Sequence, residues 1–143
     1  MKLEEILRSK GRDVITIEES RTVLEAVRTL VEHNIGGLVV MDGERPTGIL
    51  TERDILRITG ETPGELGSIQ VGAVMTTQLI TAKPDDRLAT AMDVMTENKI
   101  RHLPIMDGDR LAGIISIGDL VNACRVLAER ENSELRQYIQ GAG

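Results

Sequence analysis

The chain carries one sequence unit twice, and this internal repeat limits what the chain can fold into. A shift of 65 residues places residues 14–57 over residues 79–122 without a gap, and 13 of the aligned positions are identical. The clearest match sets MDGERPTGILTERD, from Met41, over MDGDRLAGIISIGD, from Met106. A repeat this regular indicates two copies of one supersecondary unit packed against each other. Each repeat has roughly 60 residues and would be marginally stable alone, so we expect the two to fold as a pair with two clefts at the seam between them.

The apolar pattern of each repeat predicts a β-α-β-β-α unit, so the fold class is α/β (α+β), with two units about a pseudo-two-fold axis. In the first repeat, residues 14–17 form a short strand, and a helix with an apolar stripe follows. Asp42-Gly43 is the tight turn of a hairpin, after which a second helix begins at Thr51. In the second repeat, residues 79–82 are the matching first strand. The stripe residues are Val23, Val27, Leu30 and Val31 in the first repeat and Leu88, Met92 and Met95 in the second.

Short helices precede the repeats, and a segment rich in glycine separates them. We expect one helix at residues 3–7 and its counterpart at residues 71–75. The predicted boundaries are residues 1–62 for the first repeat with its N-terminal helix, 63–70 for a linker, 71–126 for the second repeat and 127–143 for a C-terminal helical extension. The last helix reaches about Gln140, and it either covers its own half of the molecule or packs on a second subunit.

The composition argues against several classes of function. Apolar residues make up 41% of the chain, charged residues 28%, and the net charge is −6. This acidic balance, without a basic run or an aromatic stacking platform, argues against nucleic-acid binding. The uncharged apolar stretches are too short to cross a membrane, and the charged N-terminus carries no signal core. The single cysteine, Cys124, excludes an intrachain disulfide and a cysteine-cluster metal site, and it fits a reducing cytoplasm.

The most specific local pattern is a glycine, two apolar residues, a hydroxyl residue and, three positions later, an aspartate. It occurs at residues 48–54 (GILTERD) and at residues 113–119 (GIISIGD). A helix begins here directly after a strand, so unpaired backbone N–H groups and the helix dipole favour an anion such as a phosphate. The hydroxyl can bond a phosphate oxygen, the aspartate can accept both hydroxyls of a ribose, and the glycine leaves room for the approach. The alternative is a pair of helix caps, since Thr-x-x-Asp is close to a capping box.

These segments give the chain a resemblance to a tandem pair of cystathionine β-synthase (CBS) domains. The matching motifs are VMT (74–76), LIT (79–81), IRHLPIMDG (100–108) and the two Gly-to-Asp segments. The resemblance covers about residues 3–128 and leaves no room there for an attached enzyme. It implies two β-α-β-β-α units, often in a disc-shaped homodimer. It also implies binding of adenosine-containing ligands, namely AMP, ADP, ATP and in some members NAD or S-adenosylmethionine.

The resemblance also implies roles for individual residues. Ribose would be held by Asp54 and Asp119, and phosphate by Thr51 and Ser116. Adenine would meet the backbone at Thr16 and Ile17 in the first repeat and at Thr81 and Ala82 in the second. Further phosphate contacts are expected from Arg101, His102 and Arg53, with a surface salt bridge as the alternative for Arg53. Close backbone approach is expected at Gly36, Gly37, Gly48 and Gly113.

The two clefts should be unequal. The second repeat has Arg101 and His102 where the first has Gly36 and Gly37, so only the Asp54 cleft would gain cationic help across the seam. Charge-assisted hydrogen bonds are worth about 1.5–3 kcal/mol, which corresponds to an affinity gap of about one to two decades. We therefore expect the Asp54 cleft to prefer the more anionic ligand. The alternative for Arg101 is a solvated surface charge.

The sequence predicts a regulatory module, not an enzyme. No nucleophile and base stand out as a pair, no His, Cys and carboxylate set has metal-ligand spacing, and no cofactor is required. Mg²⁺ would arrive only with a nucleotide. A ligand in the seam would contact both halves, alter their relative angle and so signal to a partner protein that the sequence does not identify. The alternatives are a scaffold protein with empty clefts and a small nucleotide hydrolase or transferase.

Overall fold

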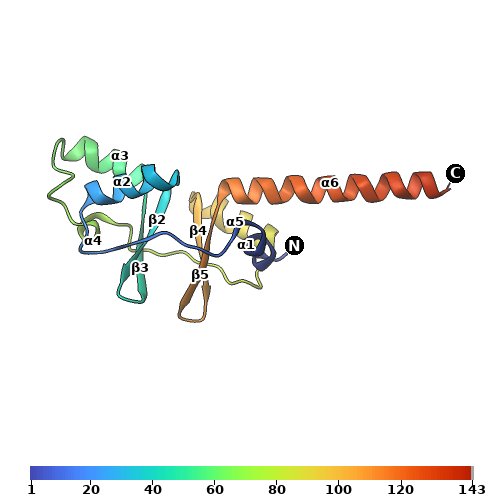
Figure 1. Cartoon of the computed structure of the whole chain (residues 1–143), viewed down its shortest axis with the longest axis horizontal. Coiled ribbons are helices and arrows are strands. Elements are labelled where there is room, and N and C mark those ends of the chain that lie inside the picture. The colour runs from blue at the N-terminus through green and yellow to red at the C-terminus, as the bar shows by residue number, and fades with distance from the viewer. Residues whose placement is uncertain (143) are drawn as a thin grey trace.

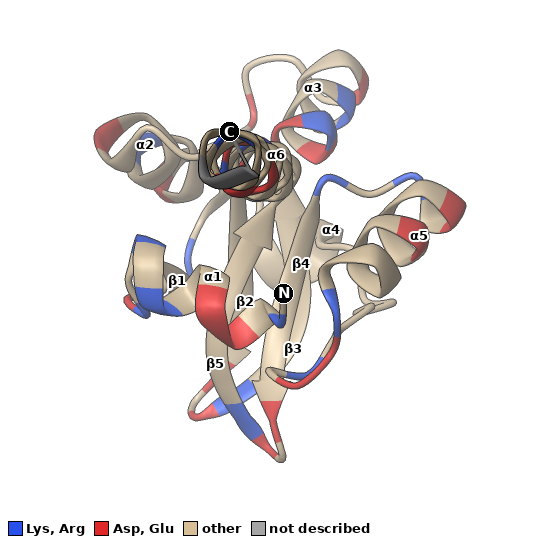
Figure 2. Ribbon diagram, turned by 90° about the vertical axis from the view of Figure 1, so that its right-hand side faces the viewer, with Lys and Arg blue, Asp and Glu red and all other residues tan. Residues whose placement is uncertain are grey.

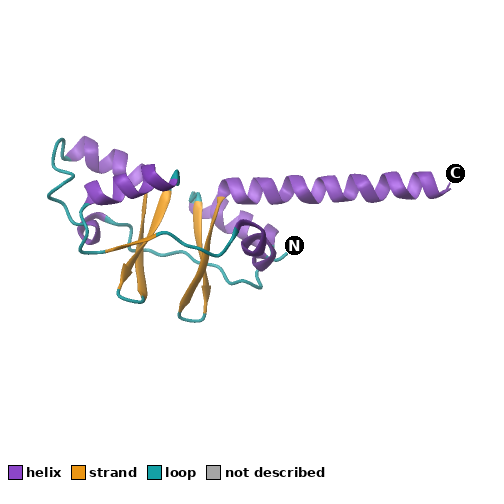
Figure 3. Cartoon of the chain, viewed as in Figure 1, coloured by secondary structure: helices purple, strands orange, loops and turns teal. Residues whose placement is uncertain are grey.

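The computed structural model describes residues 1–142 and has the predicted α/β architecture, with two β-hairpins side by side and helices packed around them (Figure 1). The first part of the chain contains α1 (Leu3–Lys10), β1 (Thr16–Glu18), α2 (Val23–His33), β2 (Gly37–Asp42), β3 (Arg45–Thr51) and α3 (Glu52–Glu61). The second part contains α4 (Val71–Val74), α5 (Leu88–Asn98), β4 (His102–Asp107), β5 (Arg110–Ser116) and α6 (Ile117–Ala142). Helices α2, α3 and α6 lie at the end of the hairpins opposite to their turns (Figure 3).

Both predicted hairpins are confirmed, and each turn lies one residue later than expected. Asp42 pairs with Arg45, so Gly43 and Glu44 form a two-residue loop in which Gly43 has a φ of 65°. A positive φ at the first loop position suits glycine, because glycine has no β-carbon to clash there. The second hairpin repeats this geometry, with Gly108 at a φ of 62°.

The predicted first strand of the second repeat is wrong. Residues 79–82 join β4 only through a single bridge at Ala82. In the first repeat, β1 runs parallel to β2, and the Glu19 N–H extends the ladder with a bond to Met41 O at 3.0 Å. The residue equivalent to Glu19 is Pro84, which has no N–H to donate, so the second ladder ends after one bridge.

Each hydrophobic core contains a helix from the other repeat. Leu3, Ile6 and Leu7 of α1 are buried in one cluster with residues of α5, β4, β5 and α6. In return, Val71 of α4 is buried with residues of α2, β2, β3 and α3. Figure 1 shows α1 beside the β4–β5 hairpin, although the chain continues from α1 into β1. We call β1, β2, β3, α2, α3 and α4 the first lobe, and α1, α5, β4, β5 and α6 the second lobe.

The buried stripes of α2 and α5 differ from the predicted ones. The buried residues are Val23, Ala26 and Leu30 in α2 and Leu88, Ala91 and Met95 in α5. Val31 and Met92, which the apolar spacing assigned to the stripes, are 75% and 39% exposed. The stripe therefore follows an i, i+3, i+7 spacing, with an alanine at the middle position in both repeats.

Helix α6 has 26 residues and two different parts. Leu120 and Ala123 are buried in the core of the second lobe, and Leu127 is packed against that core. From Ala128 to Gln140 every residue is exposed, and this part projects away from both lobes (Figure 1). The first part thus covers its own lobe, which was one of the two alternatives expected for this helix.

Candidate ligand site

The aspartates of the two Gly-to-Asp segments stand at equivalent helix starts. Asp54 lies in the first turn of α3 and Asp119 in the first turn of α6, each directly after the last strand of a hairpin. The first N–H of α3 donates to Gly36 O at 3.0 Å, and that of α6 donates to Arg101 O at 2.9 Å. In each lobe, therefore, the helix start that carries the carboxylate is tied to the residues that precede the hairpin.

Asp54 is bonded mainly to its own helix start. Its Oδ2 accepts hydrogen bonds from the Thr51 N–H at 2.9 Å and from the Thr51 hydroxyl at 3.2 Å. Its Oδ1 accepts a hydrogen bond from the Thr76 hydroxyl at 3.3 Å, and the Arg57 guanidinium lies 3.6 Å away. Thr76 lies in the segment that follows α4, so a residue of the second repeat contacts this carboxylate.

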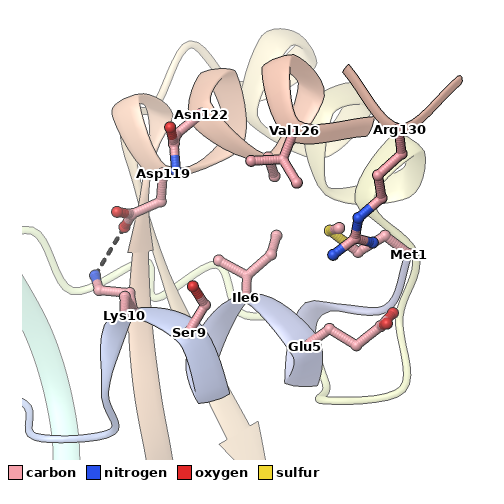
Figure 4. A pocket seen from close by; sticks show the side chains of 10 residues that line it. Met1, Glu5, Ile6, Ser9, Lys10, Asp119, Asn122, Val126 and Arg130 are labelled. Carbon is pink, nitrogen blue, oxygen red and sulfur yellow. Dashed lines mark hydrogen bonds and ion pairs between the residues drawn. The ribbon is translucent and has the colours of Figure 1, made fainter. Parts of the chain in front are cut away.

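Asp119 also caps its own helix, and in addition it holds a distant cation. Its Oδ2 accepts the Ser116 N–H at 2.8 Å, while the Ser116 hydroxyl accepts the Asp119 N–H at 3.2 Å. The Lys10 ammonium donates to the same Oδ2 at 2.7 Å and to Ile114 O at 2.8 Å (Figure 4). The side chains of Lys10 and Asp119 are 32% and 23% exposed, so water screens this ion pair only in part.

Both aspartates therefore act as helix caps, as the alternative interpretation of the motif requires. Burial raises the pKa of Asp119, but hydrogen bonds from Lys10 and Ser116 outweigh burial, so the pKa lies below its ordinary value. Asp119 is thus ionised at neutral pH. An ionised carboxylate has about four acceptor sites, so capping leaves acceptor capacity for further donors such as ribose hydroxyls.

His102 crosses the seam between the lobes. Its ring lies against the start of β2, where a β-carbon on Gly37 would come 3.0 Å from the ring Cγ. A β-carbon on Gly36 would come 3.2 Å from the ring Nε2 and 2.8 Å from the Glu52 carboxylate. The two glycines therefore make room for side chains of the protein itself, at the point where the lobes meet.

Burial also decides the charge of His102, because it lowers the pKa of the ring. The nearby carboxylates of Glu52 and Asp119 oppose this effect, while Lys10 and Arg101 add to it. The net pKa lies below the ordinary value of 6.5, so the ring is neutral at pH 7. Of the two residues expected to bring positive charge to the seam, only Arg101 carries it at neutral pH.

Gly48 and Gly113 are covered by residues that follow or belong to the exchanged helices. A β-carbon on Gly113 would come 2.5 Å from Leu7 Cδ2. One on Gly48 would come 2.7 Å from Met75 Sδ and 2.7 Å from Thr76 O. The space that a glycine leaves at each position is filled from within the chain. This packing is by itself a reason for glycine at both positions.

A small cavity lies beside Asp119. It has a volume of about 120 Å³ and runs between α1 and α6, with Lys10 and Asp119 at one end and Arg130 at the other (Figure 4). Between these ends, the side chains of Ile6 and Val126 form an apolar part of the cavity wall. Ligand pockets usually measure about 300–1,000 Å³, so this cavity alone is too small for a nucleoside.

A larger, open groove of about 1230 Å³ runs between the two hairpins. Arg12, Val14 and Thr16 line it together with residues of both hairpin turns. The ribbon in Figure 2 is coloured for both acidic and basic residues at these turns. Because Lys10 lines the small cavity and Arg12 lines the groove, the segment that follows α1 leads from one to the other.

A family model for the CBS domain matches residues 3–61 and again residues 71–126. The chain belongs to the CBS domain family. The first CBS match contains α1 and the second contains α4, so each CBS domain, taken as a stretch of sequence, contributes its first helix to the core of the other lobe.

Other CBS proteins resemble the chain over most of its length. It is 36% identical to the mitochondrial CBS domain-containing protein CBSX3 of Arabidopsis thaliana over 148 residues, which cover 97% of this chain and 72% of that protein. It is 38% identical to the CBS domain-containing protein YhcV of Bacillus subtilis over 108 residues, which cover 75% of this chain and 76% of that protein.

Solved CBS structures share the fold. The CBS-domain containing protein ATU1752 from Agrobacterium tumefaciens superposes with a TM-score of 0.83 at 35% identity, over 86% of this chain and 98% of that chain. The CBS domain pair of protein MJ0100, solved in complex with 5′-methylthioadenosine and S-adenosyl-L-methionine, gives a TM-score of 0.77 at 25% identity, over 86% of this chain and 98% of that chain.

In this CBS pair, Thr16 and Ile17 lie apart from Asp54. Strand β2 separates β1 from β3, so β1 is two strand spacings, about 10 Å, from the strand that leads to Asp54. Thr16 faces the hairpin groove, and Ile17 is buried in the first lobe. The segment that leads into β1 begins instead at Lys10, which is bonded to Asp119.

The second CBS repeat shows the matching arrangement. The segment that leads to Thr81 and Ala82 begins at Thr76, whose hydroxyl is bonded to Asp54. Thr81 is exposed, Ala82 is buried, and Arg53 is exposed on α3. The segment before β1 and the matching segment before Ala82 therefore each start beside the aspartate of the other repeat.

Sequence reasoning missed Lys10 and Thr76. The expectation that the Asp119 cleft gains no cationic help from the other repeat is wrong, because Lys10 of the first repeat is bonded to Asp119 across 109 sequence positions. No periodic pattern relates two residues so far apart, and only the exchange of α1 between the repeats brings them together. Within residues 1–142, no group of three or more His, Cys, Asp or Glu residues is arranged to hold a metal ion. None of the helices in that range combines the length and hydropathy of a membrane span.

Proposed function

We propose that this CBS pair is a regulatory module, not an enzyme, and that it binds adenosine-containing ligands at its seam. The observation that carries the proposal is the pair of carboxylates, Asp54 and Asp119, at equivalent helix starts whose N–H groups and dipole favour an anion. The MJ0100 pair, which shares the fold, was solved with 5′-methylthioadenosine and S-adenosyl-L-methionine, and this supports the ligand class. The candidates are AMP, ADP, ATP and NAD, with Mg²⁺ only as a companion of the nucleotide.

A ligand at Asp119 would lie along the segment that follows α1. Its ribose would bond Asp119 and its phosphate would lie by Ser116 and the start of α6. Its base would pass along Val14 and Thr16 into the hairpin groove, where about 1230 Å³ is open. The small cavity beside Asp119 would take only part of the ligand. By the same arrangement, a ligand at Asp54 would lie along the segment from Thr76 to Ala82.

The seam offers a way for such a ligand to act on the whole molecule. His102 of the second lobe packs on Gly36 and Gly37 of the first. Asp119 and Lys10 are among the charges near His102, so a ligand bound at Asp119 would lie near this contact between the lobes. A ligand that binds one relative placement of the lobes more tightly shifts the population toward that placement. A partner protein, which the sequence and structure leave unidentified, would read the resulting surface.

Thermal unfolding with AMP, ATP, NAD and adenosine tests this proposal. A ligand at a hundred times its dissociation constant adds about 2.7 kcal/mol. For a protein of this size, that raises the melting temperature by roughly 5–10 °C. The double variant Asp54→Asn, Asp119→Asn should lose the rise, and Asp93→Asn, at an exposed position of α5, is its control. Release of phosphate from ATP by the unaltered protein would contradict the regulatory assignment.

A scaffold with empty clefts is the second candidate function. One observation favours it, namely that both aspartates already accept hydrogen bonds from their own helix starts. No change in melting temperature with any of the four compounds at millimolar concentration would select this candidate over ligand sensing.

We also propose that the module is a homodimer formed through its helical side. Leu56 and Val121 occupy equivalent positions of the two repeats and are 76% and 63% exposed. On the projecting part of α6, Leu135, Tyr138 and Ile139 are 58%, 75% and 61% exposed. Exposed apolar side chains on this scale mark interaction surfaces when they form a patch. A second copy would cover both groups of residues.

A further inference from the structure

We propose that Lys10 makes the Asp119 cleft selective for anionic adenosine ligands, because its ammonium exchanges Asp119 for a ligand phosphate when ribose binds. The inference rests on the proposed function, since it concerns the ligand class of the same site. It adds a residue from α1, outside both Gly-to-Asp segments, as the determinant of specificity.

The starting point is a close and partly shielded ion pair. Lys10 Nζ lies 2.7 Å from Asp119 Oδ2 and donates a second bond to Ile114 O at 2.8 Å. The two side chains are 32% and 23% exposed. A charge-assisted bond at this distance is stronger than a bond between neutral groups, and the partial burial limits its replacement by water.

Ribose competes with Lys10 for the same carboxylate. Asp119 Oδ2 already accepts the Ser116 N–H and the Lys10 ammonium. A ribose that places one hydroxyl on each carboxylate oxygen brings a third donor to Oδ2, and this donor would displace or weaken the bond from Lys10. The ammonium would then keep only Ile114 O as a protein acceptor among the bonds described. Leaving a partly buried charge without its counter-charge is unfavourable, so a neutral nucleoside binds against this cost.

A phosphate removes that cost. Lys10 is the last residue of α1, and the proposed ligand lies along the segment that follows this helix. Lys10 also lines the cavity beside Asp119 (Figure 4). The helix start at Ser116 favours the phosphate in the same region. When the ligand supplies both the hydroxyls and the anion, Asp119 gains the ribose and Lys10 gains the phosphate. Both charges remain paired throughout the exchange.

The Asp54 cleft provides an internal comparison. The partner of Asp54 Oδ1 in the matching place is the neutral hydroxyl of Thr76, at 3.3 Å. The Arg57 guanidinium is 3.6 Å from the same oxygen, and its side chain is 48% exposed. Ribose at Asp54 therefore displaces no shielded cation, and the exchange described for Lys10 has no counterpart there.

Calorimetric titration of AMP and of adenosine tests the inference. Binding is measured on the full chain carrying Asp54→Asn, so that the Asp119 cleft is reported alone. We expect this protein to bind AMP on the order of tenfold more tightly than adenosine. In the added Lys10→Met variant, which keeps the aliphatic stem, we expect the ratio to fall to within about threefold, with adenosine binding at least as tightly as before. Lys10→Arg keeps the positive charge and should keep most of the selectivity.

The matched control is Arg8→Met, which removes a cation of the same helix that pairs with Glu4 at 3.6 Å. It should leave the ratio of affinities unchanged. An unchanged ratio in Lys10→Met, with both compounds still bound and the melting curve cooperative, overturns the inference but leaves the proposed function standing. Binding of neither compound to the unaltered protein overturns both. An equal loss of both compounds in Lys10→Met and Lys10→Arg assigns Lys10 a merely structural role and also overturns the inference.

Discussion

The Leu7 side chain lies so close to Gly113 that a β-carbon on this glycine would stand 2.5 Å from Leu7 Cδ2. Met75 stands in the same relation to Gly48 in the other lobe, with its Sδ at 2.7 Å from the equivalent point. Both contacts join a hairpin strand to a segment that belongs, in sequence, to the other repeat. The two repeats can therefore pack together in this way only because Gly113 and Gly48 have no side chain.

Gly113→Ala should destabilise the protein by about 1–3 kcal/mol, because the added methyl group overpacks the contact with Leu7. Chemical denaturation monitored by circular dichroism measures this change. The control is Gly60→Ala in α3, where a β-carbon meets nothing within 4 Å. Alanine is the better helix former, so Gly60→Ala should be neutral or stabilising by up to about 1 kcal/mol. Equal effects of the two substitutions would contradict the packing account.

The stability of the protein should fall as the pH drops below about 6.5, with His102 as a contributor. Burial lowers the pKa of His102 in the folded state, so the unfolded state binds more protons over the range between the folded pKa and 6.5. Stability thus rises with pH through that range, by at most about 1.4 kcal/mol per pH unit for one group. Urea unfolding from pH 5 to pH 8 checks this.

His102→Gln should flatten that pH dependence, while His33→Gln, at an exposed position of α2, should not. The groups that face His102 are Glu52 from α3, Lys10 from α1 and Asp119 from α6, with Arg101 beside it. A slope that persists unchanged in His102→Gln would show that one of these other groups dominates.

Asp119→Asn should lower the free energy of unfolding at pH 7 by about 1–3 kcal/mol, through loss of charge-assisted bonds from Lys10 and the Ser116 N–H. The folded pKa of Asp119 is depressed, so its contribution is present above the ordinary pKa and is lost as the pH falls through the folded value. The difference between Asp119→Asn and the unaltered protein should therefore shrink in acid. An equal effect of Asp109→Asn, at an exposed turn, would argue against this assignment.

The projecting part of α6 should hold the proposed homodimer together. The triple variant Leu135→Ser, Tyr138→Ser, Ile139→Ser removes the large apolar side chains there, and we expect a higher proportion of monomer by native mass spectrometry and light scattering. Gln137→Ser, in the same stretch, is the control. If the triple variant shows the same proportion of monomer as the unaltered protein, the interface is formed by the lobes alone. If the unaltered protein is itself a monomer, the proposed homodimer is wrong.

Arg101→Ala should weaken AMP at the Asp54 cleft by about tenfold, if Arg101 meets phosphate across the seam. The measurement is calorimetric titration in chains that carry Asp119→Asn, so that the Asp54 cleft is reported alone. Adenosine binding should hardly change, because it has no phosphate. An equal loss for both compounds would instead indicate a change in the lobe itself.

The hairpins and the helix starts could be predicted from the sequence because their signals are local. Each hairpin has its own Asp-Gly pair, and each helix start has its own hydroxyl and aspartate. The exchange of α1 and α4 could not be predicted, since a short amphipathic helix reveals which face it buries but not which lobe it meets. The contact between Lys10 and Asp119 was out of reach for the same reason. At Pro84 the signal was present, because a missing N–H limits the ladder, but the apolar run at residues 79–82 outweighed it in the prediction.

The exchanged helices also determine when the molecule can become compact during its synthesis. A nascent chain that has left the ribosome only as far as residue 62 has no Val71 to close its first lobe. At that moment α1 is already made, yet the surface on which it docks, from Leu88 to Ala123, does not exist. Both lobes can therefore complete their hydrophobic cores only after nearly the whole chain has been synthesised. A protease that cuts between residues 62 and 70 before the lobes have packed together would leave two fragments, each without one helix of its hydrophobic core.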